Sequence, residues 1–228
     1  MNKVIKILLS IVIVSLSALV VPLKGHSENI KTESVAVQAA VKSTEMSLEN
    51  FVIEQPVSIN FEIDTAIEEM NQKMTEIESI EDKKEWFIAY KSIIEEYSYI
   101  IDPPEAIYDY FTEEELDLLF RVVQAEVGDE YSFESKVNVA NVIFNRFYHE
   151  RFPDTLSDIL VCDQFSSIAN GRYIEVEVTE DTILACEYAF ILDDTTDGCL
   201  FFDSNNTLNY QFVFNDGAHN FYKYREEK

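Results

Sequence analysis

Residues 118–160 read LLFRVVQAEVGDEYSFESKVNVANVIFNRFYHERFPDTLSDIL, and this stretch decides the fold of the C-terminal half. Apolar residues recur at helical spacing up to Ala125, where the pattern stops. The preceding Thr112–Glu115 forms a capping-box sequence, so we expect a helix from there to about Ala125. A second helix is expected from about Glu134 to Tyr148. Glu126 therefore lies where an apolar helix gives way to a loop.

The remaining C-terminal sequence predicts helices first and a small sheet last. A short helix is expected to start at Thr155, and a longer one to span about Thr179 to Leu192. After Gly198 the apolar period falls to two, which predicts a strand at 200–203 and a hairpin of 210–214 with 218–224. We therefore expect residues 105–228 to form an α+β domain.

The segment before this domain has a different pattern. Helical spacing begins at a second capping-box sequence, Thr65–Glu68, and ends at the helix-breaking Asp102-Pro103-Pro104. Residues 65–104 are predicted to form a helical hairpin, either a scaffold packed on the C-terminal domain or, through 65–101, a surface for a protein partner. Residues 28–64 are interpreted as a tether, in which the alternating run at 57–63 is a short strand or an apolar latch.

Residues 1–27 have the organisation of a signal peptide. Lys3 and Lys6 precede an apolar run at 7–22, and cleavage is expected after Ser27. The run would span about 24 Å as a helix, short of the roughly 30 Å hydrocarbon core of a membrane. The sequence therefore predicts a secreted, extracytoplasmic protein, which would be membrane-anchored if the signal stays uncleaved.

Charge and composition exclude several function classes. The net charge of −26 argues against binding to nucleic acid. The chain has three histidines, none at ligand spacing, and no metal or other cofactor is expected. The three cysteines, Cys162, Cys186 and Cys199, match no zinc signature and are expected to be buried thiols.

Glu126 is the first candidate catalytic residue. Desolvation against an apolar helix favours the protonated form of a carboxyl group, which a general acid in glycosidic cleavage requires. The alternative is an ordinary exposed glutamate at a helix end, one of 43 acidic residues in the chain. The local pattern alone does not decide between them.

A set of ordered motifs adds weight to the catalytic interpretation. These are LLFRVVQAEVGDE, KVNVANVIFNR, FPDTLSDIL, CDQFSSIANG, LFFDSN and DGAHNFYKY. Together they resemble the catalytic domain of the SleB-type cell wall hydrolases, the spore cortex-lytic enzymes, over about residues 113–224. The resemblance implies a lysozyme-like fold, cleavage of peptidoglycan between N-acetylmuramic acid and N-acetylglucosamine, and Glu126 as the catalytic acid. The chain departs from the family in lacking its separate peptidoglycan-binding repeats.

Further residues are candidates for substrate binding or for support of the site. Hydrogen bonds to sugar groups are expected from Gln164 and Ser166, ring stacking from Phe165, Tyr173 and Tyr222, and a substrate or carboxylate contact from His219. The supporting candidates are Glu130, Asn145 and Arg146, with Arg146 either paired to an acid such as Glu130 or placed to favour its helix C-terminus.

Three functions remain open from the sequence. A lytic transglycosylase needs one acid, because the muramic 6-hydroxyl attacks internally. A muramidase-type hydrolase activates water with a second carboxylate, for which Asp129 and Glu130 are candidates. The non-enzyme alternative is a catalytically weak wall-binding or assembly protein on the same fold.

Overall fold

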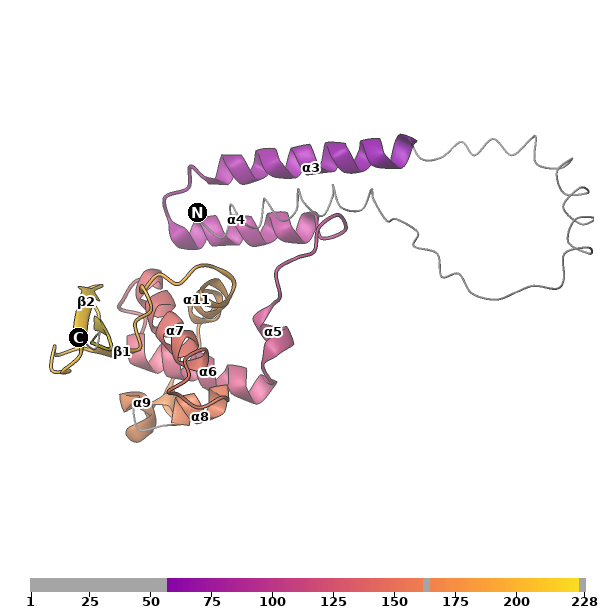
Figure 1. The fold of residues 1–228 in the computed structure, drawn as a ribbon. Coiled ribbons are helices and arrows are strands. Elements are labelled where there is room, and N and C mark those ends of the chain that lie inside the picture. Colours follow the sequence, from indigo (N-terminus) through magenta and orange to yellow (C-terminus); the bar gives the residue numbers. More distant parts are fainter. Residues whose placement is uncertain (1–56, 162–164, 226–228) are drawn as a thin grey trace, which may run out of the picture.

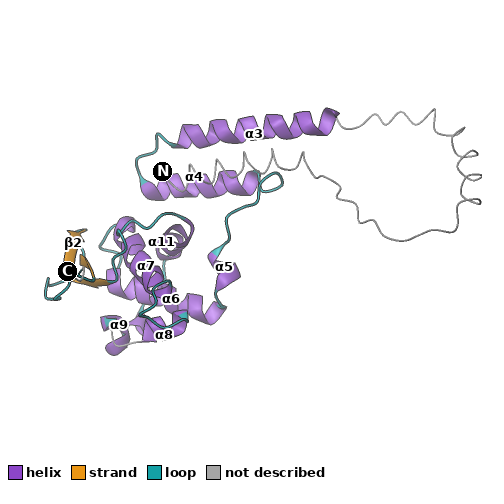
Figure 2. Cartoon of the chain, viewed as in Figure 1, coloured by secondary structure: helices purple, strands orange, loops and turns teal. Residues whose placement is uncertain are grey.

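The computed structural model describes residues 57–161 and 165–225 (Figure 1). The predicted signal peptide, most of the tether, Cys162 and Gln164 lie outside these ranges. No helix within them is long and apolar enough to cross a membrane. The described chain consists of an N-terminal helical hairpin and a C-terminal domain of helices with a small sheet at one end (Figure 2).

The hairpin consists of α3 (Val57–Ile77) and α4 (Lys83–Glu96), which lie side by side (Figure 1). The short strand expected at 57–63 is wrong, because α3 already begins at Val57. No Pro or Gly interrupts the sequence from there to Ile77, and Thr65 lies inside the helix instead of capping it. Asp82 caps α4 by accepting a hydrogen bond from the Glu85 amide at 2.8 Å.

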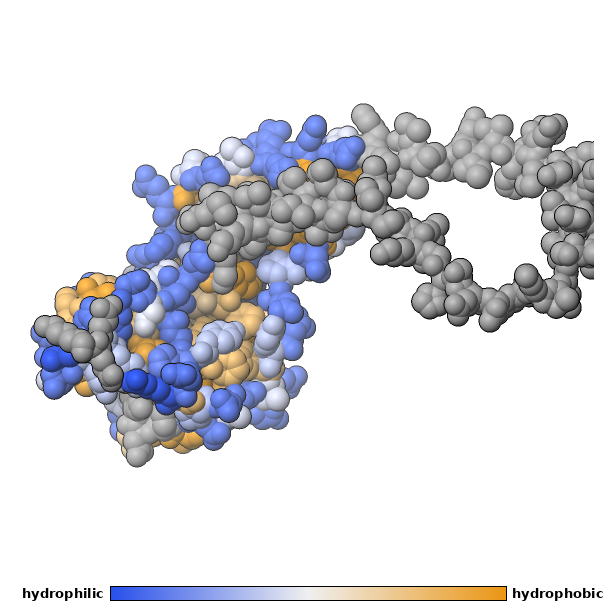
Figure 3. Space-filling view, in the orientation of Figure 1, coloured by the Kyte–Doolittle hydropathy of each residue, from blue (hydrophilic) through white to orange (hydrophobic). Residues whose placement is uncertain are grey.

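The hairpin shares a core with α11 (Glu180–Ile191) of the C-terminal domain. Phe87 of α4 is fully buried, and its ring meets Tyr188 edge-on at 5.1 Å. Ion pairs between Lys84 and Asp181 and between Lys91 and Glu187 also join α4 to α11. Figure 3 shows hydrophilic side chains over much of the outer surface of the hairpin. These contacts favour the scaffold interpretation of the hairpin.

The C-terminal domain is built around three packed helices, α6 (Glu113–Val127), α7 (Phe133–Phe147) and α11. The predicted capping box is present, with Thr112 and Glu115 exchanging hydrogen bonds at the start of α6. Most residues of α7 are buried, because this helix packs against both of the others. The shorter helices are α5 (Ile107–Tyr110), α8 (Leu156–Val161), α9 (Ser166–Ala169) and α10 (Arg172–Glu175).

The sheet has three antiparallel strands in the order β1-β3-β2. They are β1 (Phe201–Asp203), β2 (Gln211–Asn215) and β3 (Asn220–Lys223), which confirms the predicted strand and hairpin. Alternation gives the sheet two faces. Phe202 and Phe221 pack toward the main core, whereas Phe201 and Tyr222 belong to a separate cluster. The predicted α+β class is confirmed.

Two of the three cysteines lie in the described ranges. Cys186 and Cys199 are free and buried, as expected. Burial raises the pKa of the Cys199 thiol to about 12, and that of Cys186 rises for the same reason. Both side chains therefore act as small apolar core residues.

Candidate active site

Glu126 lies in the last turn of α6 and lines a cleft of about 620 Å³. The walls of this cleft come from the end of α6 and the loop after it, from α9 and the segment around α10, and from the loops next to strands 201–203 and 220–223. Lining residues that could contact a ligand include Glu130, Ser166, Arg172, Glu177 and His219. The side chain of Glu126 is half-buried, and polar groups surround its carboxylate.

The Glu126 carboxylate is held by the start of α9. Its Oε1 accepts a hydrogen bond of 2.8 Å from the backbone N–H of Ser167. The Ser166 hydroxyl lies 3.2 Å from Oε2 and 3.4 Å from Oε1. Among the described residues, Oε1 is thus anchored by the backbone, while the shortest contact of Oε2 is with a rotatable hydroxyl. This arrangement orients one oxygen and leaves the other available to a ligand.

Gly128 ends α6 in a conformation that side chains disfavour, with φ 76° and ψ −178°. A Cβ at this position would lie 2.2 Å from Oε2 of Glu130. The carboxylate of Glu130 therefore occupies the space that the glycine leaves open. The glycine both turns the chain after Glu126 and admits the Glu130 side chain to the cleft wall.

Gly128→Ala is expected to lower the free energy of unfolding by about 1–3 kcal/mol, because the backbone is strained there, and to reduce activity, because relief of the strain shifts the end of α6 that carries Glu126. Gly198→Ala is the matched control, since Gly198 has φ 75° but nothing within 4 Å of its added Cβ. We expect the control to lose stability without losing activity. Chemical denaturation and a lytic assay measure both quantities; equal activity in the two variants would contradict the role given to Gly128.

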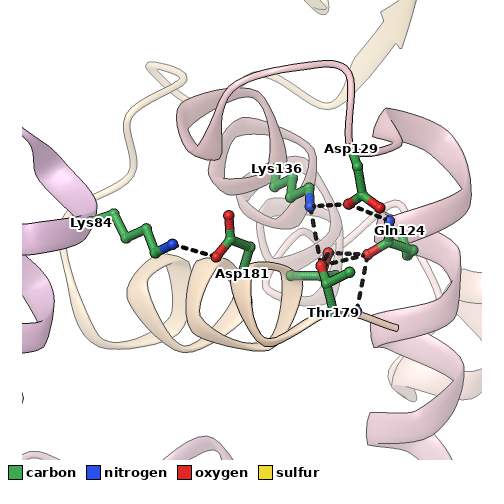
Figure 4. Close-up of polar contacts among 7 residues, drawn as sticks. Lys84, Gln124, Asp129, Lys136, Thr179 and Asp181 are labelled. Atoms are coloured by element: carbon green, nitrogen blue, oxygen red, sulfur yellow. Dashed lines mark hydrogen bonds and ion pairs between the residues drawn. The ribbon is translucent and has the colours of Figure 1, made fainter. Parts of the chain in front are cut away.

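Asp129 lies in a polar network at the wall of the cleft (Figure 4). It accepts hydrogen bonds of 2.9 Å from Gln124 Nε2 and from the ammonium of Lys136, which is itself buried. These contacts lower the pKa of Asp129, although desolvation opposes them. Gln124 and Lys136 also contact Thr179 at the start of α11. Asp129 thus stays ionised and ties the loop after α6 to α7 and α11.

His219 lies on the sheet side of the cleft. The residue is only 5% exposed, and its ring centroid lies 5.0 Å from that of Phe202 in an edge-on contact. Burial lowers the pKa of His219, while Asp216, Glu126 and Asp203 act in the opposite direction. Its Nδ1 has no hydrogen-bond partner in the described chain. The imidazole is therefore a neutral group at the edge of the cleft, with its Nδ1 buried.

Arg172 is a cleft residue that the sequence analysis missed. Its guanidinium donates to the backbone carbonyl of Ala125, next to Glu126. This bond satisfies one of the carbonyls left open at the end of α6. In the sequence, the one indication of a role for Arg172 was a basic residue directly after Gly171 in an acidic chain. Its bond to Ala125 depends on the short helices α9 and α10, which the sequence pattern did not predict.

The structure brings Glu126, Glu130, Ser166 and His219 to one cleft, as the sequence predicted. Tyr173 is only half-buried and packs against the main core. Gln164 lies outside the described residues.

Phe165 and Tyr222 do not lie in the cleft, and both are almost fully buried. Phe165 belongs to the main core of the domain. The Tyr222 hydroxyl donates to Asp203 at 2.8 Å and contacts Asn206 at 2.9 Å. Although burial opposes it, the pKa of Asp203 is lowered to about 2 by these and neighbouring hydrogen bonds, including those from Thr207. The expected stacking of Phe165 and Tyr222 on sugar is therefore replaced by structural roles.

Asn145 and Arg146 support the domain away from the cleft. Asn145 donates hydrogen bonds of 3.1 Å to Asp194, Thr196 and the carbonyl of Cys199, tying α7 to the loop before β1.

Arg146 Nε donates to the Leu200 carbonyl at 2.7 Å, and its guanidinium lies over Phe165 at 4.8 Å. In the part of the chain that the structure describes, it forms no ion pair with Glu130. No group of three metal-ligating side chains occurs there either.

Comparison with known proteins finds a family match in the C-terminal part of the chain. Residues 130–226 match the model of the family described as Cell Wall Hydrolase, a match that begins after Glu126. This match confirms the resemblance to cell wall hydrolases that the ordered motifs indicate. The match thus relates residues 130–226 to a family of cell wall enzymes.

Two solved structures are similar. The catalytic domain of the germination-specific lytic transglycosylase SleB from Bacillus anthracis is 22% identical, with a TM-score of 0.46, over 51% of this chain and 100% of that chain. The catalytic domain of the Bacillus cereus SleB protein is 24% identical, with a TM-score of 0.45, over 50% and 92%. No curated protein matches the chain in sequence.

Proposed function

We propose that this domain cleaves the bond between N-acetylmuramic acid and N-acetylglucosamine in peptidoglycan as a lytic transglycosylase, with Glu126 as its single acid and base. The observation that carries the proposal is the carboxylate of Glu126, fixed at one oxygen by Ser167 and open to the cleft at the other. An oriented carboxyl group beside an open cleft is what proton donation to a glycosidic oxygen requires.

The two oxygens of Glu126 have different roles in this mechanism. Protonated Oε2 gives its proton to the bridging oxygen as the C1–O bond breaks and an oxocarbenium-like centre develops. The carboxylate then takes the proton of the muramic 6-hydroxyl, whose oxygen bonds to C1. The products are a free hydroxyl on one fragment and a 1,6-anhydro end on the other, with Glu126 protonated again.

The surrounding residues have supporting roles in the proposal. Ser166 and His219 are substrate-binding residues, because both line the cleft and the Ser166 hydroxyl lies 3.2 Å from Oε2 of Glu126. Arg172 is a positioning residue, since its bond to the Ala125 carbonyl fixes the end of α6. A signal sequence at 1–27 would deliver the enzyme to the cell wall, its site of action.

The hydrolase alternative requires a second carboxylate to activate water. Asp129 is engaged by Lys136 and Gln124, which leaves it poorly placed to accept a proton from water. Glu130 and Glu177 also line the cleft and are the remaining candidates. The anchoring of Asp129 supports the transglycosylase, which needs no second acid.

Digestion of purified sacculi is expected to release muropeptides with 1,6-anhydro ends, each lacking one water relative to the hydrolysis product. Mass spectrometry of the products measures this directly. Products with reducing ends would instead support the hydrolase, and Glu130→Gln and Glu177→Gln would then identify its base. Binding to sacculi without release of muropeptides would support a wall-binding protein.

A further inference from the structure

A second cleft, of about 590 Å³, lies at the other face of the sheet and shares no lining residue with the cleft at Glu126. Arg151, after α7, and Arg225, after β3, both line it, together with Tyr210, Tyr224 and Glu150. It thus combines two arginines and two tyrosines with one carboxylate. The proposed mechanism uses none of these residues.

Aromatic rings form a rigid floor for this second cleft. Tyr210 stacks on Phe201 with centroids 3.9 Å apart and planes within 4°. Tyr224 meets the same two rings edge-on, at 5.1 Å from Phe201 and 5.9 Å from Tyr210. Edge-to-face and stacked contacts of this kind hold rings in place. The floor therefore belongs to the packed sheet face and does not depend on a ligand.

The two arginines differ from the other basic residues of the described chain. Seven Lys and Arg side chains form ion pairs with carboxylates. Arg146 and Arg172 bond to backbone carbonyls.

The contacts described for Arg151 and Arg225 are instead to neutral groups: Arg151 lies 4.7 Å over the Tyr224 ring, and Arg225 donates to Asn209 at 2.7 Å. The structure describes no ion pair for either one. In a chain of net charge −26, two guanidinium groups that form no ion pair within the described residues thus line one cleft, beside the single carboxylate of Glu150.

We infer that this second cleft binds an anionic group, a carboxylate or a phosphate, carried by the cell wall. Guanidinium groups bind both anions through paired hydrogen bonds, and the tyrosine rings offer a face for the attached sugar or carbon chain. Placing the ligand in the wall rests on the proposed function. Such a contact would hold an acidic enzyme on its substrate at a point separate from the bond that it cleaves.

The test compares binding to sacculi in a Glu126→Gln background, so that digestion does not interfere. Arg151→Gln combined with Arg225→Gln is expected to weaken binding about tenfold. Lys73→Gln combined with Lys84→Gln is the matched control, because it removes the same charge from residues that are ion-paired on the hairpin. Thermal denaturation checks that both double variants fold. Equal binding by the two double variants would overturn the inference.

Treated sacculi identify the source of the anion. If phosphate polymers carry it, the effect of the arginine substitutions disappears on sacculi from which these polymers have been extracted. If carboxylates of the peptide stems carry it, the effect disappears on sacculi whose free carboxylates have been converted to amides. An effect that persists on sacculi lacking both overturns the inference. The proposed function is tested separately: it fails if the parent protein releases no muropeptides, regardless of how the arginine substitutions affect binding.

Discussion

Replacing Glu126 with Gln is expected to slow the release of muropeptides from sacculi by at least about 10³-fold. Glutamine has the shape of glutamate, and its amide oxygen can still accept the hydrogen bond from the Ser167 backbone. It cannot transfer a proton to the glycosidic oxygen. The variant therefore removes the proposed chemistry and leaves the geometry of the cleft in place.

Glu177→Gln is the control for this experiment. Glu177 lines the same cleft, so its substitution removes the same charge from the same surroundings. We expect it to lose less than about tenfold in rate, in line with a residue that does not transfer the proton. Rates are measured by muropeptide release at saturating sacculi, with binding measured in parallel. A Glu126→Gln protein that lyses sacculi at the parental rate would refute the assignment of the catalytic acid.

The helices and strands that carry strong periodicity were predictable from the sequence. The capping residue Thr112 and the apolar face that follows it place α6 correctly, within two residues of its observed end at Val127. Glycine at the next position then makes Glu126 the last acid before the turn. The main helices and the β2–β3 hairpin were predicted correctly. Three other predicted site residues, Glu130, Ser166 and His219, also line the cleft.

The errors have two physical causes. Helices of four residues, such as α9 and α10, are too short to show a period, so the contacts of Ser167 with Glu126 and of Arg172 with Ala125 could not be foreseen. Alternation along a strand shows that Tyr222 and Phe221 face opposite ways, but not which side holds the ligand. Both faces of this sheet are covered by aromatic residues, and Tyr222 lies on the face away from Glu126.

The sequence also did not show whether the Phe165 ring packs in the core or contacts a ligand. Its burial leads to the second large expected effect. Phe165→Ala is expected to lower the free energy of unfolding by about 3–5 kcal/mol, because the ring is fully buried and its removal leaves a cavity. The cavity would open beneath the Arg146 guanidinium, which lies 4.8 Å from the ring centroid. The buried cation would then lose a favourable contact as well.

Chemical denaturation of Phe165→Ala and Phe212→Ala separates the structural role of Phe165 from a substrate role. Phe212 on β2 is 51% exposed, so its removal is expected to cost about 1 kcal/mol or less. Phe165→Leu should recover most of the stability and the lytic rate, since an aliphatic side chain refills the core without an aromatic ring. If the Phe165→Leu protein is stable but does not bind sacculi, the Phe165 ring instead stacks on a sugar, which would reach it when α9 moves away from the core.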